Sequence, residues 1–98
     1  MALMQLTVIP LGTSSVSVGA FVAEFQKALH AEKVAFTLTD MGTIIEGETP
    51  MLLALAAKIH AMPFAHGVQR VVTQISIDER RDKSVVLGDK IRSVQERL

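Results

Sequence analysis

The chain has 98 residues, of which 49% are apolar, and its ten basic side chains balance its ten acidic ones. A net charge of zero lacks the positive potential with which nucleic-acid-binding proteins displace counterions from phosphates, so we do not expect strong binding to a phosphate backbone. The chain contains no cysteine, which rules out disulfides, thiolate catalysis and cysteine-based zinc sites.

The chain opens with a predicted strand over residues 3–9, within one domain that we expect to span residues 1–98. Polar Gln5 and Thr7 alternate with apolar neighbours, which is the period of a half-buried strand. Pro10 lacks a backbone donor and Gly12 permits a sharp turn, so we expect the strand to end there. The opening residues include neither a basic leader nor a long hydrophobic segment, and we therefore expect a cytoplasmic protein without membrane contact.

A helix and a hairpin are predicted to follow. Apolar residues recur at three- and four-residue spacing up to about Ala31, with Ser15 or Ser17 as the cap of this helix. Alternation returns over residues 34–40 and 43–46, on either side of a Met-Gly pair. Such a pair favours a tight reversal, so the two segments should form a hairpin.

The second half of the chain continues with a helix, a strand and a further helix. Thr49 is predicted to cap a helix that Pro63 stops, and a loop then leads to a strand over residues 70–77. The charged residues 78–83 are expected to form a solvated loop. Apolar residues at helical spacing over residues 87–98 predict a C-terminal helix.

This order of elements predicts an α+β fold, the ferredoxin-like split βαβ (βαββαβ) sandwich with an additional C-terminal helix. Right-handed crossovers place both helices on one face of a four-stranded antiparallel sheet and leave the opposite face open. The alternation assigns to this open face a mixture of amide, hydroxyl and aliphatic side chains: Gln5, Thr7, Ile9, Thr37, Thr39, Ile44, Glu46, Val72, Gln74 and Ser76.

The open face is predicted to be covered by a second copy of the chain. Surfaces in water normally carry Lys and Glu, whereas amides and hydroxyls among aliphatic residues suit a contact that excludes water. Packed sheets lie about 10 Å apart, so small residues can leave a ligand-sized gap between them. A solvated sheet of modest polarity is the alternative. Single-stranded RNA readers of this topology stack bases on aromatic residues, and no Phe falls on this face, so RNA binding fits poorly.

Glu46 is the strongest candidate for a site residue. Near a strand end its carboxylate is costly unless it is paired or recognises a cation or an amidine-like edge, and the alternative is a glutamate that points to solvent. Thr13, in a Gly-Thr-Ser-Ser run, is a candidate anion contact, although helix capping explains the run more simply. Thr39, Asp40 and Thr43 flank the hairpin turn as candidate pocket residues, and turn chemistry alone also accounts for Asp40.

No catalytic residue is predicted. The three histidines, His30, His60 and His66, have no recognisable metal-ligand spacing. No nucleophile and base stand out as a pair. We therefore expect a protein that is not an enzyme and that carries no metal or cofactor.

Three short polar signatures resemble, in their order, those of the small thiamine-binding protein family of the YkoF-like superfamily. They are Pro10-Leu11-Gly12-Thr13, Gly42-Thr43-Ile44-Ile45-Glu46-Gly47 and Gly67-Val68-Gln69-Arg70-Val71, followed by Asp78, Arg80, Asp82, Lys83 and residues 90–94. The likeness covers nearly the whole chain. It implies a ferredoxin-like domain that pairs its sheet with a second copy, as a homodimer that assembles into a homotetramer, and that binds thiamine without catalysis.

The resemblance implies a ligand with a cationic thiazolium and an aminopyrimidine edge. A buried carboxylate with hydroxyl neighbours suits both, and Glu46, Thr43 and Thr39 match that requirement. Asp40 stands where the family pattern has proline, and it either changes the stiffness of the turn or adds a second negative group. Met41, or a phenylalanine, is expected to pack against the ring.

The working hypothesis is therefore a carrier or sensor of thiamine (vitamin B1), or of a related aminopyrimidine, at or near a sheet-to-sheet subunit interface. The alternative is a structural or regulatory homo-oligomeric module with no small-molecule ligand.

Overall fold

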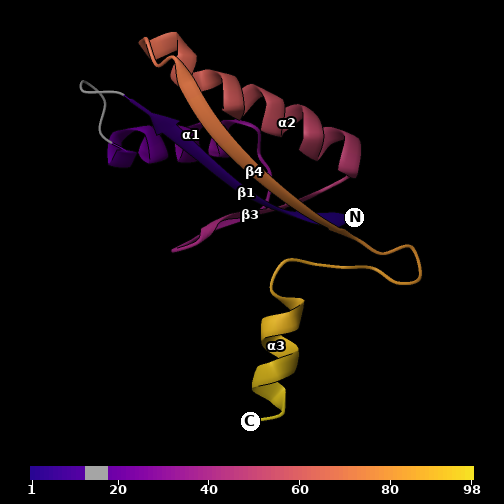
Figure 1. Ribbon diagram of the computed structural model, residues 1–98. Coiled ribbons are helices and arrows are strands. Elements are labelled where there is room, and N and C mark those ends of the chain that lie inside the picture. The colour runs from indigo at the N-terminus through magenta and orange to yellow at the C-terminus, as the bar shows by residue number, and fades with distance from the viewer. Residues whose placement is uncertain (13–17) are drawn as a thin grey trace.

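The computed structural model describes residues 1–12 and 18–98. Its elements in chain order are β1 (Ala2–Leu11), α1 (Val18–Ala31), β2 (Phe36–Thr39), β3 (Gly42–Gly47), α2 (Thr49–Ala61), the short 3₁₀ helix η1 (Met62–His66), β4 (Arg70–Glu79) and α3 (Asp89–Glu96) (Figure 1). The strands form one antiparallel sheet in the order β2-β3-β1-β4. The predicted ferredoxin-like α+β fold with an additional C-terminal helix is confirmed.

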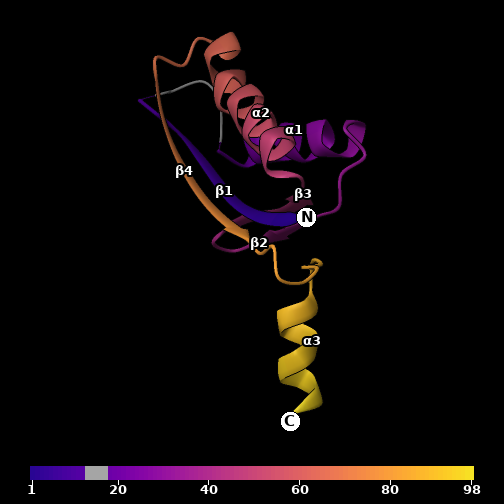
Figure 2. The ribbon, with the colours of Figure 1, turned by 90° about the vertical axis from the view of Figure 1, so that its right-hand side faces the viewer.

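Helices α1 and α2 cover the same face of the sheet (Figure 2). The strict alternation of β1 explains this, because its helix-facing residues are apolar and buried while their neighbours are amides and hydroxyls. In the described part of the chain the core cluster consists of apolar side chains: Ala2, Met4, Leu6, Val8, Phe21, Phe25, Leu29, Ile45, Leu52, Leu55, Ala56 and Ile59. The opposite sheet face is covered by neither α1 nor α2, as the sequence predicts, and residues 85–91 lie beside its residues Leu3, Thr37 and Ile44.

Strand β1 ends at Leu11, within the predicted Pro10-Leu11-Gly12 signature, but Pro10 lies inside the strand and the predicted last residue, Ile9, is two residues short. Strand β1 pairs with β4 as far as Leu11, opposite Arg70, whereas its pairing with β3 ends at Leu6, opposite Thr43. Proline is tolerated in a strand where the missing N–H faces no partner strand. Pro10 occupies such a stretch, because it lies four residues beyond Leu6, the last residue of β1 that is paired with β3.

Two further boundaries differ from the prediction. Thr49 is the first residue of α2 and Glu48 holds the cap position without a side-chain cap; the Thr49 hydroxyl donates instead to the carboxylate of Glu79 on β4. Strand β4 extends to Glu79, so Asp78 and Glu79 belong to the strand and not to the charged loop, since they pair with the first residues of β1. The predicted caps of α1, Ser15 and Ser17, fall outside the described residues.

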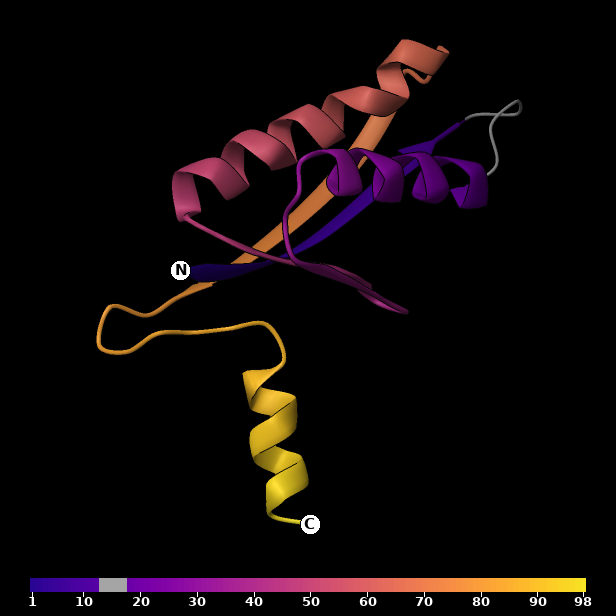
Figure 3. The same cartoon turned by 180° about the vertical axis from the view of Figure 1, so that it is seen from behind.

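Helix α3 extends away from the rest of the chain in every view (Figure 3). The segment that leads to it passes the open face, where Val85 is buried and the Lys90 ammonium lies 2.8 Å from a carboxylate oxygen of Asp78. The radius of gyration is 14.8 Å. A compact domain of this length would have about 13 Å. The excess reflects the outward position of α3.

Candidate functional site

The register of the sheet places the predicted open-face residues side by side. Gln5 of β1 is paired with Ser76 of β4 on one side and with Ile44 of β3 on the other. Two residues further along β1, Thr7 is paired with Gln74. Directly opposed residues in antiparallel strands point to the same face, so these side chains share one surface, as expected from the alternation.

Glu46 lies on this face near the other end of the sheet. It is paired with Leu3, which Asp78 flanks from β4. Asp78 is bound by Lys90, whereas no cation among the described residues forms an ion pair with Glu46. The partly buried carboxylate of Glu46 is thus available to a ligand or to a second copy of the chain.

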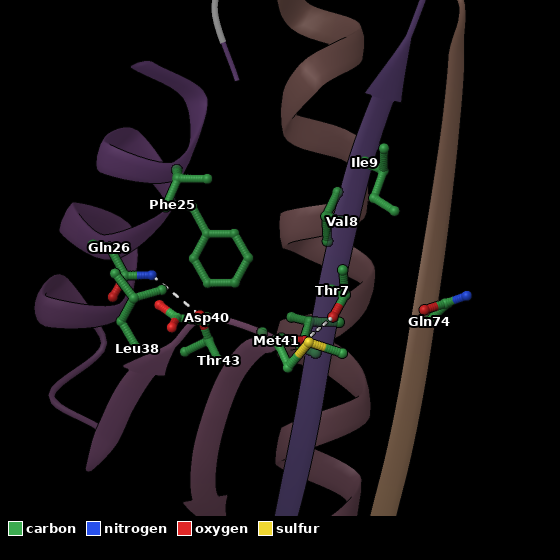
Figure 4. Close-up of a pocket in the computed structure, with 13 residues that line it drawn as sticks. Thr7, Val8, Ile9, Phe25, Gln26, Leu38, Asp40, Met41, Thr43 and Gln74 are labelled. Carbon is green, nitrogen blue, oxygen red and sulfur yellow. Dashed lines mark hydrogen bonds between the residues drawn. The ribbon is translucent and has the colours of Figure 1, made fainter. Parts of the chain in front are cut away.

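A cavity of about 390 Å³ lies beside the first residues of β3, between the β2–β3 turn, β1 and α1 (Figure 4). We call it the turn cavity. It is lined by Leu6, Thr7, Val8, Ile9, Val22, Phe25, Gln26, Leu38, Asp40, Met41, Gly42, Thr43 and Gln74. Aliphatic residues and one phenylalanine form its walls, and the amide, hydroxyl and carboxylate groups lie among them. Such a combination is typical of small-molecule sites.

One wall of the turn cavity is fixed by a hydrogen bond between α1 and β3. The side-chain amide of Gln26 donates to the hydroxyl of Thr43 over 3.2 Å, and the two side chains point toward each other (Figure 4). Thr43 is 3% exposed, so its hydroxyl depends on this partner.

Hydrogen bonds on the open face hold the turn against β1. The carbonyl of Met41 accepts hydrogen bonds from the Gln5 amide and the Thr7 hydroxyl, each over 3.2 Å. The hydroxyl of Thr39 donates to the carbonyl of Gly42 over 2.7 Å and accepts from the N–H of Met41. These bonds use polar side chains of the open face to set the position of a cavity wall.

Of the five predicted site residues that the structure describes, three come together in one cavity. Asp40, Met41 and Thr43 line the turn cavity, whereas Thr39 and Glu46 do not. Thr43 and Glu46 point to opposite faces of β3, because they are three residues apart on a strand. The predicted combination of Glu46, Thr43 and Thr39 is therefore not a single cluster. Thr13 lies outside the described residues.

Three residues of α1, Val22, Phe25 and Gln26, line the cavity, and none of them was predicted as a site residue. Phe25 was assigned to the buried stripe of its helix, where it also lies, at 4% exposed. Gln26 follows Val22 by four residues, so helical spacing puts this amide beside the apolar stripe. A polar residue at the edge of a core-facing stripe was the available signal.

The turn cavity continues toward the open face. A second hollow of about 200 Å³ is lined by residues of β1, β4 and the turn, and it shares Thr7, Met41 and Gln74 with the first. A ligand in the turn cavity would thus lie next to whatever covers the open face.

The described residues offer no metal site, since no group of three or more His, Asp or Glu side chains comes together in residues 1–12 and 18–98. His60 contacts the Thr73 hydroxyl and His66 contacts Glu24, so both have local partners. None of the helices in the described part of the chain is both long and apolar enough to cross a bilayer.

The sequence pattern of a family described as thiamine-binding protein matches residues 4–95. Among relatives, the UPF0045 protein YqgV of Bacillus subtilis is 48% identical over the whole of this chain and 98% of its own length. A UPF0045 protein of Methanothermobacter thermautotrophicus is 41% identical over 96% of each chain.

Solved structures share the fold. The hypothetical protein MJ1052 of Methanocaldococcus jannaschii has a TM-score of 0.83 at 27% identity and matches 97% of this chain and 96% of its own. A Thermotoga maritima protein, whose name assigns it to thiamine biosynthesis or salvage, has a TM-score of 0.78 over 95% of this chain and 97% of its own. Its identity is 14%, so this likeness shows the fold alone.

Proposed function

The chain belongs to the thiamine-binding protein family, and on that premise we propose that it binds thiamine, or a related aminopyrimidine or thiazole metabolite, in the turn cavity. We further propose that it acts in the cytoplasm as a carrier or sensor without catalysis. The observation that carries the proposal is a cavity of suitable size and mixed polarity in a chain of this family. Small-molecule pockets have volumes of about 300–1,000 Å³, and the turn cavity falls within that range.

Asp40 is the carboxylate that we assign to the ligand in this cavity. A cationic thiazolium is attracted to a nearby carboxylate, and the Asp40 side chain is the acidic group of the lining. Phe25 and Met41 supply the apolar contacts for a planar ring. Glu46 then has a separate role at the open face, where its charge needs a partner from a second copy.

A second copy on the open face would complete the environment of the ligand. The turn cavity and the open-face hollow share three residues, so a sister sheet packed there would close the cavity on the side away from α1. We propose a homodimer built in this way, which assembles further into a homotetramer.

Isothermal titration calorimetry with thiamine tests the function. We expect saturable binding that Asp40→Asn weakens by roughly twofold to fivefold, the upper part of the range for loss of one exposed charge contact. Asp82→Asn is the matched control, because this aspartate pairs with Arg80 in the loop after β4 and does not line the cavity. Glu46→Gln is measured alongside, and a larger loss there would assign the cation contact to Glu46. Absence of heat at millimolar thiamine would refute the proposed ligand.

A module that serves only assembly is the second candidate function. The observation in its favour is α3 and the residues after it, where Ile91, Val94 and Leu98 are 66%, 58% and 99% exposed. Apolar residues at this helical spacing form one stripe, which a partner would bury. This function predicts a stable oligomer that gives no binding heat with thiamine or its pyrimidine part.

A further inference from the structure

The main chain of β1 beside the turn cavity has hydrogen-bonding groups that no described strand pairs with. Pairing between β1 and β3 ends at Leu6, opposite Thr43, while β1 continues to Leu11 along β4. The cavity is lined by Thr7, Val8 and Ile9, which directly follow the last pair. The cavity therefore occupies the position that a longer β3 would fill.

The direction of each main-chain group follows from the pairing of β3. The N–H of Glu46 donates to the carbonyl of Ala35, on the side of β2, over 3.0 Å. Because main-chain directions alternate along a strand, Ile45 turns its groups toward β1, where it is paired with Met4. By the same alternation along β1, Leu6 and Val8 turn theirs toward β3.

The surroundings of Gly42 agree with this assignment. A Cβ built on Gly42 would lie 3.1 Å from the carbonyl oxygen of Leu6, so that carbonyl points toward β3. Val8, two residues on, then directs its N–H and C=O into the cavity. Pro10, the next residue of β1 whose main chain faces this side, has a carbonyl and no N–H. The free edge thus offers one donor, the N–H of Val8, and the carbonyls of Val8 and Pro10.

We propose that this edge of β1 recognises the heterocycle directly, with the N–H and C=O of Val8 pairing with a ring nitrogen and an adjacent amino group. The inference rests on the proposed function and specifies which main-chain groups bind the ligand. In an antiparallel ladder the N–H and C=O of one such residue form a closely spaced pair. An aminopyrimidine presents the complementary acceptor and donor on neighbouring atoms, so its ring takes the place of a β3 residue.

The walls of the cavity fit a flat ring in this position. A ring that pairs with a strand edge lies near the plane of the sheet, so one ring face meets α1, where Val22 and Phe25 line the cavity. The other ring face points toward the open side, near Met41 and Gln74. The β2–β3 turn closes one end of the turn cavity. This favours a small ring over an additional β-strand paired with β1.

Replacing the Val8 N–H by an ester oxygen, through incorporation of the α-hydroxy acid analogue of valine, tests the inference. This change keeps the side chain and removes no donor from the β4 ladder, because the Val8 N–H points away from β4. It also makes the Thr7 carbonyl a weaker acceptor toward β4, and the control below does the same to the Ser76 carbonyl of that ladder. We expect affinity for thiamine to fall by roughly fivefold to tenfold, the effect of one hydrogen bond in a closed site. The same ester at Ile77 is the control, since Ile77 is a strand residue outside the cavity and its affinity should equal that of the unmodified chain.

Amide hydrogen exchange supplies a second readout that does not depend on a variant. Exchange of the Val8 N–H should slow in proportion to the thiamine bound. Unchanged exchange at saturation, together with full affinity of the ester variant, would overturn this inference while leaving the proposed function intact. Protection that follows protein concentration instead of thiamine would also overturn it, because the edge would then pair with another copy. Absence of any thiamine binding would overturn both.

Discussion

Gly42 is the residue that fixes the geometry of the turn. Its φ of +141° is one that L side chains rarely adopt, and an added Cβ would lie 2.6 Å from the Thr7 hydroxyl. That hydroxyl already donates to the carbonyl of Met41. A side chain at Gly42 would therefore disturb the same bonds that hold the cavity wall.

We expect Gly42→Ala to lower the free energy of unfolding by about 3 kcal/mol, from backbone strain and steric overlap together. Gly67→Ala is the matched control, because Gly67 also has a positive φ, +84°, but nothing within 4 Å of its added Cβ. Gly67→Ala should lower the free energy of unfolding by about 1 kcal/mol. Chemical denaturation measures both values. Equal losses in the free energy of unfolding would show that the close approach to Thr7 does not contribute to the destabilisation.

The site was only partly predictable at the level of residues. The hairpin turn was identified because Met41-Gly42 is a strong turn signal, and that brought Asp40 and Thr43 into the candidate set. The alternation already leaves Thr43 off the open face, as observed, and the error is the grouping of Thr43 with Glu46 in one site, since period two sends them to opposite sides. Gln26 was missed because only the folded packing of α1 against β3 gives this amide its partner.

One of the hydrogen bonds between α2 and β4, from Thr49 to Glu79, has a predictable pH dependence. The Thr49 hydroxyl, and then Arg81, hold the pKa of Glu79 below its ordinary value of 4.5. A carboxyl whose pKa is lowered by folding stabilises the fold above its unfolded pKa, and this contribution is lost as pH falls through the folded pKa.

Thr49→Val should therefore raise the pKa of Glu79 toward 4.5, because it removes the largest cause of the shift. NMR titration of the Glu79 carboxyl carbon measures this directly. Arg81→Gln is the comparison, and it should move the pKa in the same direction, because it removes both the hydrogen bond and the charge of Arg81. An unchanged titration curve in Thr49→Val would contradict the contact.

Strand β1 allows a prediction about its two edges. Val8 turns its N–H to the turn cavity and Ile9 turns its N–H to β4, where Ile9 is paired with Val72. Relative to Val8→Ala and Ile9→Ala, which account for the lost side chains, Val8→Pro should thus add clearly less destabilisation than Ile9→Pro, which removes a bond of the β1–β4 ladder. Thermal denaturation of the four variants is the measurement. Equal destabilisation would contradict the main-chain directions that we assign to β1.

The elements themselves were predictable because hydrophobic periodicity is strong in this chain. The order of strands and helices, the end of α1 at Ala31 and the hairpin were all confirmed. The error at Pro10 has a tertiary cause, since a proline ends a strand only where its missing N–H would face a partner. That β3 stops before Pro10 depends on pairing between distant segments, which local sequence does not encode.

For the whole molecule, α3 and the part of the open face that residues 85–91 do not cover are two surfaces that one copy leaves exposed. The helix extends away from the sheet, and its exposed apolar stripe contains Ile91 and Val94. Stripes of this kind are usually buried by a partner. The paired substitution Ile91→Asp with Val94→Asp should shift the assembly to smaller species in analytical ultracentrifugation. An unchanged mass would show that α3 takes no part in assembly.

The central claim is that a thiamine-like ligand binds in the turn cavity against the free edge of β1. Titration of ¹⁵N-labelled protein with thiamine, followed by NMR, tests it most directly. The account predicts saturable shifts concentrated at residues 7–9, at Gln26 and at residues 40–43, with little change in α3. Shifts confined to the surroundings of Glu46 and Leu3, or no shifts at millimolar thiamine, would contradict it.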